Sequence, residues 1–153
     1  MGDTMSFIVQ RLNLNRFEAD EYYKQALVDY GKEDFEEGIL KMEQAINMLP
    51  NNAEYYAARG MMYYRAGIHD MARKDFEKAL ALYPHEMLAH YGLGAVAYHD
   101  QRYDEAARHF DAAYRLDSKR PETLYFMALT HHKLGYKQYA VPIMRMAHDL
   151  FPE

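Results

Sequence analysis

Histidines are the residues of this sequence that could hold a metal ion, and the chain has eight of them. His131 and His132 are adjacent, so on a helix their side chains diverge by about 100° and cannot share one ion. His99 and His132 could approach each other across neighbouring helices. However, no carboxylate or third histidine is placed to complete a site there. We therefore expect no metal site.

Residue patterns of catalysis are also missing from the sequence. It contains no glycine-rich phosphate loop, no nucleophile motif and no cysteine. The lack of cysteine excludes disulfides and thiolate zinc sites. We therefore expect a protein that is not an enzyme and that uses no cofactor.

Tyrosine occurs fifteen times, and it clusters around a glycine in the stretch YYAARGMMYYRAG, residues 55–67. Tyr56 and Tyr63 lie four residues before and three residues after Gly60, so a helix places all three on one side. A glycine in a helix interior costs about 1 kcal/mol relative to alanine. Its presence here predicts a close contact with a second helix, where a Cβ atom would hold the two helices apart.

The sequence repeats itself every 34 residues. Pro50, Pro84 and Pro152 are separated by 34 and 68 residues, and Ser118 stands where the missing proline of this series would be. A period of this length is typical of arrays of helix–turn–helix units. Four further sets of equivalent residues, which we call columns, recur at the same 34-residue interval. They are Ala45, Ala79, Ala113 and Ala147; Gly38, Ala72, Ala106 and Ala140; Met42, Phe76, Phe110 and Met144; and Ala26, Gly60, Gly94 and Ala128.

This pattern resembles the tetratricopeptide repeat, a helix–turn–helix unit of 34 residues. The resemblance covers residues 19–152 and is specific for fold but only weakly specific for function. Residues 19–50 match least well, because Gln25 and Asp29 stand where apolar residues are usual. The best match is residues 53–84, which carry Tyr56, Gly60, Tyr63, Ala72, Phe76, Ala79 and Pro84.

The resemblance implies an all-α fold, a right-handed superhelical solenoid of four helix–turn–helix repeats. We expect the repeats at residues 19–52, 53–86, 87–120 and 121–153. Within them we expect helices near residues 19–31, 35–48, 53–66, 69–82, 87–100, 103–116, 121–134 and 137–150.

Residues 1–18 precede the repeats, and two structures fit them. Met5, Ile8, Val9 and Leu12 follow the spacing of an apolar helical stripe. This spacing indicates a short helix that packs on the first repeat. The alternating apolar residues of 7–9 and 12–14 also fit an extended arm that reaches a groove of its own or of a neighbouring chain.

In this family the fifth, ninth and twelfth residues of each repeat line a concave groove. Steps of four and three residues also place each trio on one face of a helix. Six of the twelve are tyrosine, which suits a surface that binds a partner's peptide or helix. The alternative is that the rings pack against one another as extra core. The twelve are Tyr23, Leu27, Tyr30, Ala57, Met61, Tyr64, Tyr91, Ala95, Tyr98, Tyr125, Leu129 and His132.

The two rims of the expected groove carry opposite charges. Acids stand near the start of each first helix and bases near its end, which fits either a ligand along the groove or simple compensation of the helix dipoles. The residues are Asp20, Glu54 and Glu122 on one rim, and Arg65, His99 and Lys133 on the other.

Some family members bind the C-terminal carboxylate of chaperones through a clamp of lysine, asparagine and arginine. The matching positions here hold Tyr23, Leu27, Ala58, Leu88 and Gly92. None of these side chains can hold a carboxylate, so we do not expect that activity.

Charge and hydropathy narrow the choice of partner and compartment. The net charge is −5 and the chain has no basic stripe, so we expect no nucleic-acid partner. Because no apolar run spans a bilayer and no secretory signal is evident, we expect no membrane insertion and a cytoplasmic location.

Two functions remain open. The first is an adaptor that binds a protein or peptide partner in the tyrosine groove. The second is a structural module that self-associates through its N-terminal arm or through its last repeat. In that repeat a following helix would normally cover several apolar residues, among them Met144, Met146, Leu150 and Phe151.

Overall fold

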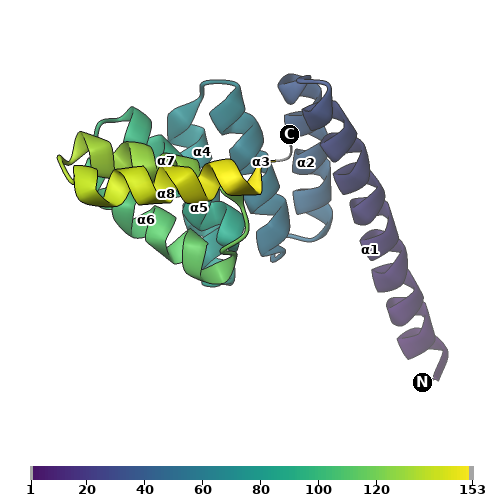
Figure 1. Cartoon of the computed structure of the whole chain (residues 1–153). Helices are drawn as coiled ribbons and strands as arrows, with labels where there is room; N and C mark the ends of the chain where they lie inside the picture. The colour runs from purple at the N-terminus through teal and green to yellow at the C-terminus, as the bar shows by residue number, and fades with distance from the viewer. Residues whose placement is uncertain (1, 152–153) are drawn as a thin grey trace. The chain divides into compact units, whose positions relative to one another are not determined.

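The computed structural model describes the backbone of residues 2–151 and the side chains of residues 4–151. Within this part of the chain there are eight α-helices and no strand (Figure 1). None of these helices is long and apolar enough to cross a membrane. The helices are α1 (Gly2–Gly31), α2 (Phe35–Met48), α3 (Ala53–Arg65), α4 (His69–Leu82), α5 (Met87–His99), α6 (Tyr103–Leu116), α7 (Pro121–Lys133) and α8 (Lys137–Leu150).

The helices form two compact units, Met1–Leu82 and Tyr83–Glu153. In the first unit α1 packs on α2, α3 packs on α4, and α2 also contacts α3. The second unit repeats this arrangement, with the pairs α5–α6 and α7–α8 joined by a contact between α6 and α7. The expected all-α fold of helix–turn–helix pairs is therefore confirmed. The repeat boundaries given above remain a prediction.

The first helix differs from what the sequence predicts. Residues 2–31 form one continuous helix, so residues 2–18 form neither a separate short helix nor an extended arm. Residues 4–14 are all exposed, and this segment therefore does not pack on the first repeat. The helix is continuous because no proline or glycine interrupts residues 3–30. Figure 1 shows α1 running well past the end of α2.

The turns inside the helix pairs use one left-handed residue each. Gly67 and Gly135 have φ values of 83° and 85°. The matching positions in the other two pairs are Glu33 and Gln101, with φ values of 61° and 63°. A left-handed conformation costs a non-glycine residue about 1–2 kcal/mol. The turn geometry is thus kept at every 34th residue, even where the side chain does not favour it.

Close packing between the paired helices explains the central glycines. A Cβ atom added at Gly60 would lie 2.7 Å from Cε1 of Phe76, and one added at Gly94 would lie 2.7 Å from Cε1 of Phe110. Both phenylalanines are fully buried. The expected close contact at Gly60 is therefore real, and it is made with a ring of the second helix.

A repeated hydrogen bond ties each of two first helices to the proline before it. The Tyr56 hydroxyl donates to the Pro50 carbonyl oxygen at 2.9 Å. Nε2 of His90 lies 2.9 Å from the Pro84 carbonyl oxygen. Both side chains occupy the same position of the repeat, so His90 serves the packing rather than a metal site.

A buried ion pair joins α3 to α4. Nε of Arg59 lies 2.8 Å from one carboxylate oxygen of Asp75, and Nη2 lies 2.8 Å from the other. Asp75 is only 4% exposed. Burial raises the pKa of the Asp75 carboxyl, and the bonds from Arg59 oppose this shift. The Arg59 guanidinium also lies 5.8 Å from the ring centre of Tyr56 and 5.9 Å from that of Tyr63.

Candidate functional site

The predicted groove residues of the first unit lie on α1 and α3. Tyr23, Tyr30 and Tyr64 are half-buried, and Leu27 is exposed. Met61 is only 7% exposed and belongs to the core. The sequence placed Met61 on a binding surface because position alone cannot show how deeply a side chain lies. We call Tyr23, Leu27, Tyr30 and Tyr64 the first tyrosine surface.

Tyr23 is held in place across the gap between α1 and α3. Its ring centre lies 5.2 Å from that of Tyr55, and its hydroxyl donates to Oε1 of Glu54 at 2.7 Å. Tyr55 is buried and was not predicted as part of the site. The predicted rim acid Glu54 therefore orients a tyrosine of the same chain.

Arg65, a predicted basic rim residue, is likewise engaged with its own chain. Its guanidinium carbon lies 5.6 Å from the ring centre of Tyr30 and 5.3 Å from that of Phe35. Nη2 lies 3.2 Å from Oε1 of Glu33, and Nη1 donates to the Tyr30 hydroxyl at 3.4 Å. Arg65 thus fixes the ring of Tyr30 while its own side chain stays partly exposed.

Tyr64 lies against the start of α4. Its ring stacks on that of His69, with the ring centres 5.6 Å apart. Burial raises the pKa of the Tyr64 hydroxyl above its usual value, so this group is a neutral donor and acceptor at physiological pH. Together these contacts leave tyrosine rings of the first surface accessible but fixed.

Aromatic packing is denser in the second unit. Phe126 lies at the centre, with its ring centre 5.9 Å from that of Tyr91, 5.6 Å from Tyr98 and 5.3 Å from Phe110. Tyr91 is only 6% exposed, and the Arg120 guanidinium lies 4.9 Å from its ring centre. Tyr91 therefore belongs to the core and not to an accessible surface. For Tyr91, the structure agrees with the alternative in which the rings pack against one another as extra core.

Four predicted groove residues of the second unit remain accessible. Tyr98 and Leu129 are half-buried, Tyr125 is 42% exposed, and His132 is exposed. We call these four the second tyrosine surface. The ring of Tyr98 is held between Tyr103 and Phe126, at 5.5 Å and 5.6 Å between ring centres.

The remaining predicted rim residues are at the surface. His99, Glu122 and Lys133 are exposed, and Asp20 is half-buried. Asp20 lies 3.2 Å from Nζ of Lys24, and Glu122 lies 3.8 Å from Nε of Arg120. Glu122 lies in the first turn of α7, where compensation of the helix dipole explains it as well as a ligand does. Asp20 lies inside the continuous helix α1, so that explanation does not apply to it.

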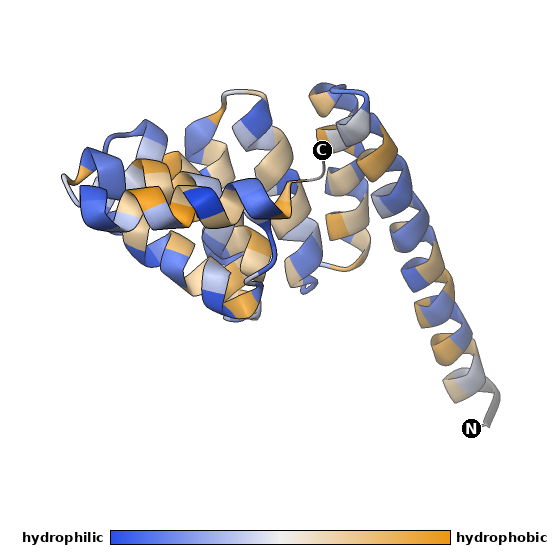
Figure 2. Ribbon diagram, in the orientation of Figure 1, coloured by the Kyte–Doolittle hydropathy of each residue, from blue (hydrophilic) through white to orange (hydrophobic). Residues whose placement is uncertain are grey.

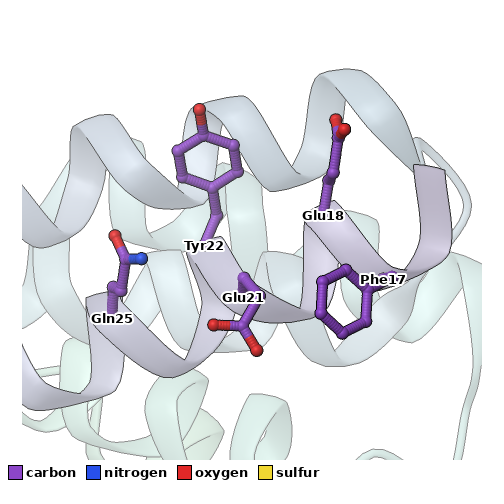
Figure 3. A pocket seen from close by; sticks show the side chains of 5 residues that line it. All are labelled: Phe17, Glu18, Glu21, Tyr22 and Gln25. Atoms are coloured by element: carbon purple, nitrogen blue, oxygen red, sulfur yellow. The ribbon is translucent and has the colours of Figure 1, made fainter. Parts of the chain in front are cut away.

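A depression on α1 is lined by Phe17, Glu18, Glu21, Tyr22 and Gln25. Figure 3 shows that these five side chains leave one helix in different directions and do not converge on a point. Among the residues with a described placement, no group of three histidines or carboxylates could hold a metal ion. The depression therefore lacks the converging groups that catalysis requires.

The model of the family described as "Tetratricopeptide repeat" matches residues 23–86 and 69–121 of this chain. The chain belongs to the tetratricopeptide repeat family. The matched residues include in full the helices α3 and α5, which carry Tyr64 and Tyr98.

Curated relatives match this chain over a minor part of their own length. The human protein SGT1 homolog is 28% identical over 95 residues, which is 62% of this chain and 25% of that protein. The wheat (Triticum aestivum) Hsp70-Hsp90 organizing protein is 27% identical over 116 residues, 70% of this chain and 20% of that protein. This chain thus spans about a quarter or less of the relatives it matches.

Solved structures share the fold at low sequence identity. A crystal structure of MamA has a TM-score of 0.74 and 16% identity, covering 92% of this chain and 82% of that one. The first TPR of Spaghetti (RPAP3), bound to the HSP90 peptide SRMEEVD, has a TM-score of 0.73 and 18% identity, covering 78% and 95%. These similarities agree with the tetratricopeptide fold of this chain.

Proposed function

We propose that this chain is a protein-interaction module that binds a partner's peptide or helix on its tyrosine surfaces. The family membership supports a role in protein–protein interaction. The binding of a partner on the tyrosine surfaces is supported by one observation. The tyrosine side chains of these surfaces are accessible, yet ring contacts and hydrogen bonds within the chain already hold them in place. A ligand that binds such rings loses little side-chain entropy on the protein side.

The chemistry of the surfaces favours an uncharged ligand. Tyrosine offers a large ring and a hydroxyl, which suit apolar or aromatic anchors and backbone hydrogen bonds. The nearby charges of Glu54 and Arg65 are engaged by Tyr23, Tyr30 and Glu33. We propose an extended or helical segment with aromatic or aliphatic anchors as the ligand.

The structure of the first TPR of Spaghetti holds an acidic peptide. At the positions expected for a carboxylate clamp this chain has Tyr23, Leu27, Ala58, Leu88 and Gly92. Ala58 and Gly92 are buried, and the Tyr23 hydroxyl already donates to Glu54. We therefore propose a ligand class that differs from acidic chaperone tails.

Selection from a displayed library of random peptides tests this function. We expect enriched sequences with two or more aromatic or aliphatic anchors and little net charge. Enrichment of acidic C-terminal sequences would contradict the proposed ligand class. Failure to enrich any sequence from extended and helical libraries would contradict peptide binding itself.

A second candidate function is self-association, which exposed apolar side chains on two helices favour. On α8, Val141 and Tyr139 are among the exposed large side chains. On α1, the same holds for residues of the N-terminal half, where hydrophobic residues (orange) recur in Figure 2. Light scattering over a range of concentrations tests this candidate, and a constant monomer mass would contradict it.

A further inference from the structure

One apolar seam runs along most of α1. Its positions alternate in steps of three and four residues, as in a coiled coil: Met5, Ile8, Leu12, Asn15, Ala19, Tyr22 and Ala26. The C-terminal part of the seam is covered. Ala19 and Ala26 are fully buried in one core cluster with Met42 and Ala45 of α2.

The N-terminal part of the same seam has no cover in this structure. α1 has 30 residues and α2 has 14, so α2 can pack along only about half of it. Met5 is 65% exposed, Ile8 45% and Leu12 59%. Val9 beside the seam is 50% exposed. An apolar helix face that continues from a packed region into solvent is typical of a surface that contacts another helix.

We propose that a second copy of this chain covers the seam, with the N-terminal halves of the two α1 helices pairing antiparallel. This proposal extends the self-association candidate above and does not depend on peptide binding. The two uncovered segments have the same length, so each covers the other completely. The pairing also brings the positive N-terminal end of each α1 near the negative C-terminal end of the partner copy's α2.

The heptad spacing fixes one register for this pairing. Ile8 packs against the partner's Leu12, and Met5 packs against the partner's Asn15. Beside these layers, Val9 meets the partner's Val9 and Arg11 meets the partner's Arg11. The valines add apolar contact and the two arginines repel each other. The two-fold symmetry makes the contact closed, so association stops at a dimer.

The size of the seam predicts a weak dimer. Four side chains on each helix keep about half of their surface exposed, which gives on the order of 400 Å² per helix and roughly 800 Å² in the pair. This is at the small end of specific contacts, so we expect a dissociation constant in the micromolar range or above.

Sedimentation equilibrium from micromolar to submillimolar protein tests the proposal. We expect a monomer–dimer equilibrium for the unmodified chain. Replacing Ile8→Glu with Leu12→Glu should weaken it at least about tenfold, because the pair would bury carboxylates. The control Ser6→Glu with Gln10→Glu adds the same charge on the opposite side of α1 and should keep the dimer. Circular dichroism shows that each variant retains its helices.

Cysteine pairs test the direction of the helices, since the chain contains no cysteine. A mixture of Met5→Cys and Asn15→Cys chains should form a disulfide-linked dimer, and neither chain alone should do so. Cross-linking of Met5→Cys with itself would contradict the antiparallel register. A monomer at all concentrations, or an oligomer that survives Ile8→Glu with Leu12→Glu, would overturn the proposal. Neither result would bear on the tyrosine surfaces.

Discussion

Gly60 is a residue at which packing between paired helices leaves no room for a methyl group. Gly60→Ala gains about 1 kcal/mol of helix propensity. However, the new Cβ atom would lie 2.7 Å from a ring carbon of Phe76, which is fully buried and cannot move freely. Overpacking of this kind costs about 1–3 kcal/mol, so we expect no gain or a net loss in the free energy of unfolding.

The matched control for this substitution is Gly31→Ala at the end of α1, where a Cβ atom meets nothing within 4 Å. Gly31→Ala should stabilise the protein by up to about 1 kcal/mol. Chemical denaturation of both variants provides the measurement. A stability gain for Gly60→Ala equal to that of Gly31→Ala would show that the contact with Phe76 is loose.

The Arg59–Asp75 pair should behave as a coupled unit. Arg59→Leu leaves the Asp75 carboxylate buried without its partner, which costs about 3–5 kcal/mol. In the double variant with Asp75→Leu no charge is left behind, so most of that loss should be recovered. A double-mutant cycle by urea denaturation measures the coupling. Additive losses would show that the two charges do not depend on each other.

Residue chemistry in the sequence predicted the close contact at Gly60. It did not predict that Tyr91 is buried. That outcome depends on Phe126, a neighbouring ring from another helix whose position follows from tertiary packing. Likewise, the sequence marked Glu54 and Arg65 as rim charges, but the bonds that engage them with tyrosines required the structure.

Among the helices, α1 is the one with two different environments along its length. Residues 4–14 are exposed, whereas Ala19 and Ala26 are fully buried. In dilute, monomeric protein, backbone amides of residues 6–14 should exchange with solvent much faster than those of residues 20–30. Local opening of the first part breaks no tertiary contact. Hydrogen exchange measured by mass spectrometry checks this, and equal protection along α1 would contradict it.

The bounds of the other seven helices lie within one residue of those predicted from the sequence. The agreement follows from the 34-residue period, which fixes each turn through several columns at once. Residues 1–18 have no such columns. Their apolar residues favour a helix but also fit an extended arm. The structure decides between the two, because one helix runs without a break from Gly2 to Gly31.

For the whole molecule, the proposed ligand class predicts a difference from the first TPR of Spaghetti, whose structure holds the HSP90 peptide SRMEEVD. We expect the peptide SRMEEVD not to bind, since the clamp positions hold no basic side chain. Fluorescence anisotropy with a labelled peptide checks this, with the first TPR of Spaghetti as the positive control. Saturable micromolar binding by this chain would show that other residues hold the carboxylate.

The central claim is that the tyrosine surfaces bind the partner. The most direct measurement is the affinity of a library-selected peptide for the double variant Tyr64→Ala with Tyr98→Ala. Tyr64 and Tyr98 lie on the two different surfaces, and truncation of an interface tyrosine often costs about 2 kcal/mol, so we expect a loss of about 30-fold or more with helical content unchanged. The matched control is Tyr83→Ala with Tyr139→Ala, two exposed tyrosines outside the surfaces.

Titration calorimetry at low and physiological salt completes the test. The account predicts that the control variant binds as the unmodified chain does, and that moderate salt has little effect because the contacts are apolar and hydrogen-bonding. Undiminished binding by Tyr64→Ala with Tyr98→Ala, together with a collapse of affinity in salt, would contradict the account. Binding would then depend on charged residues such as Arg65 and Lys133.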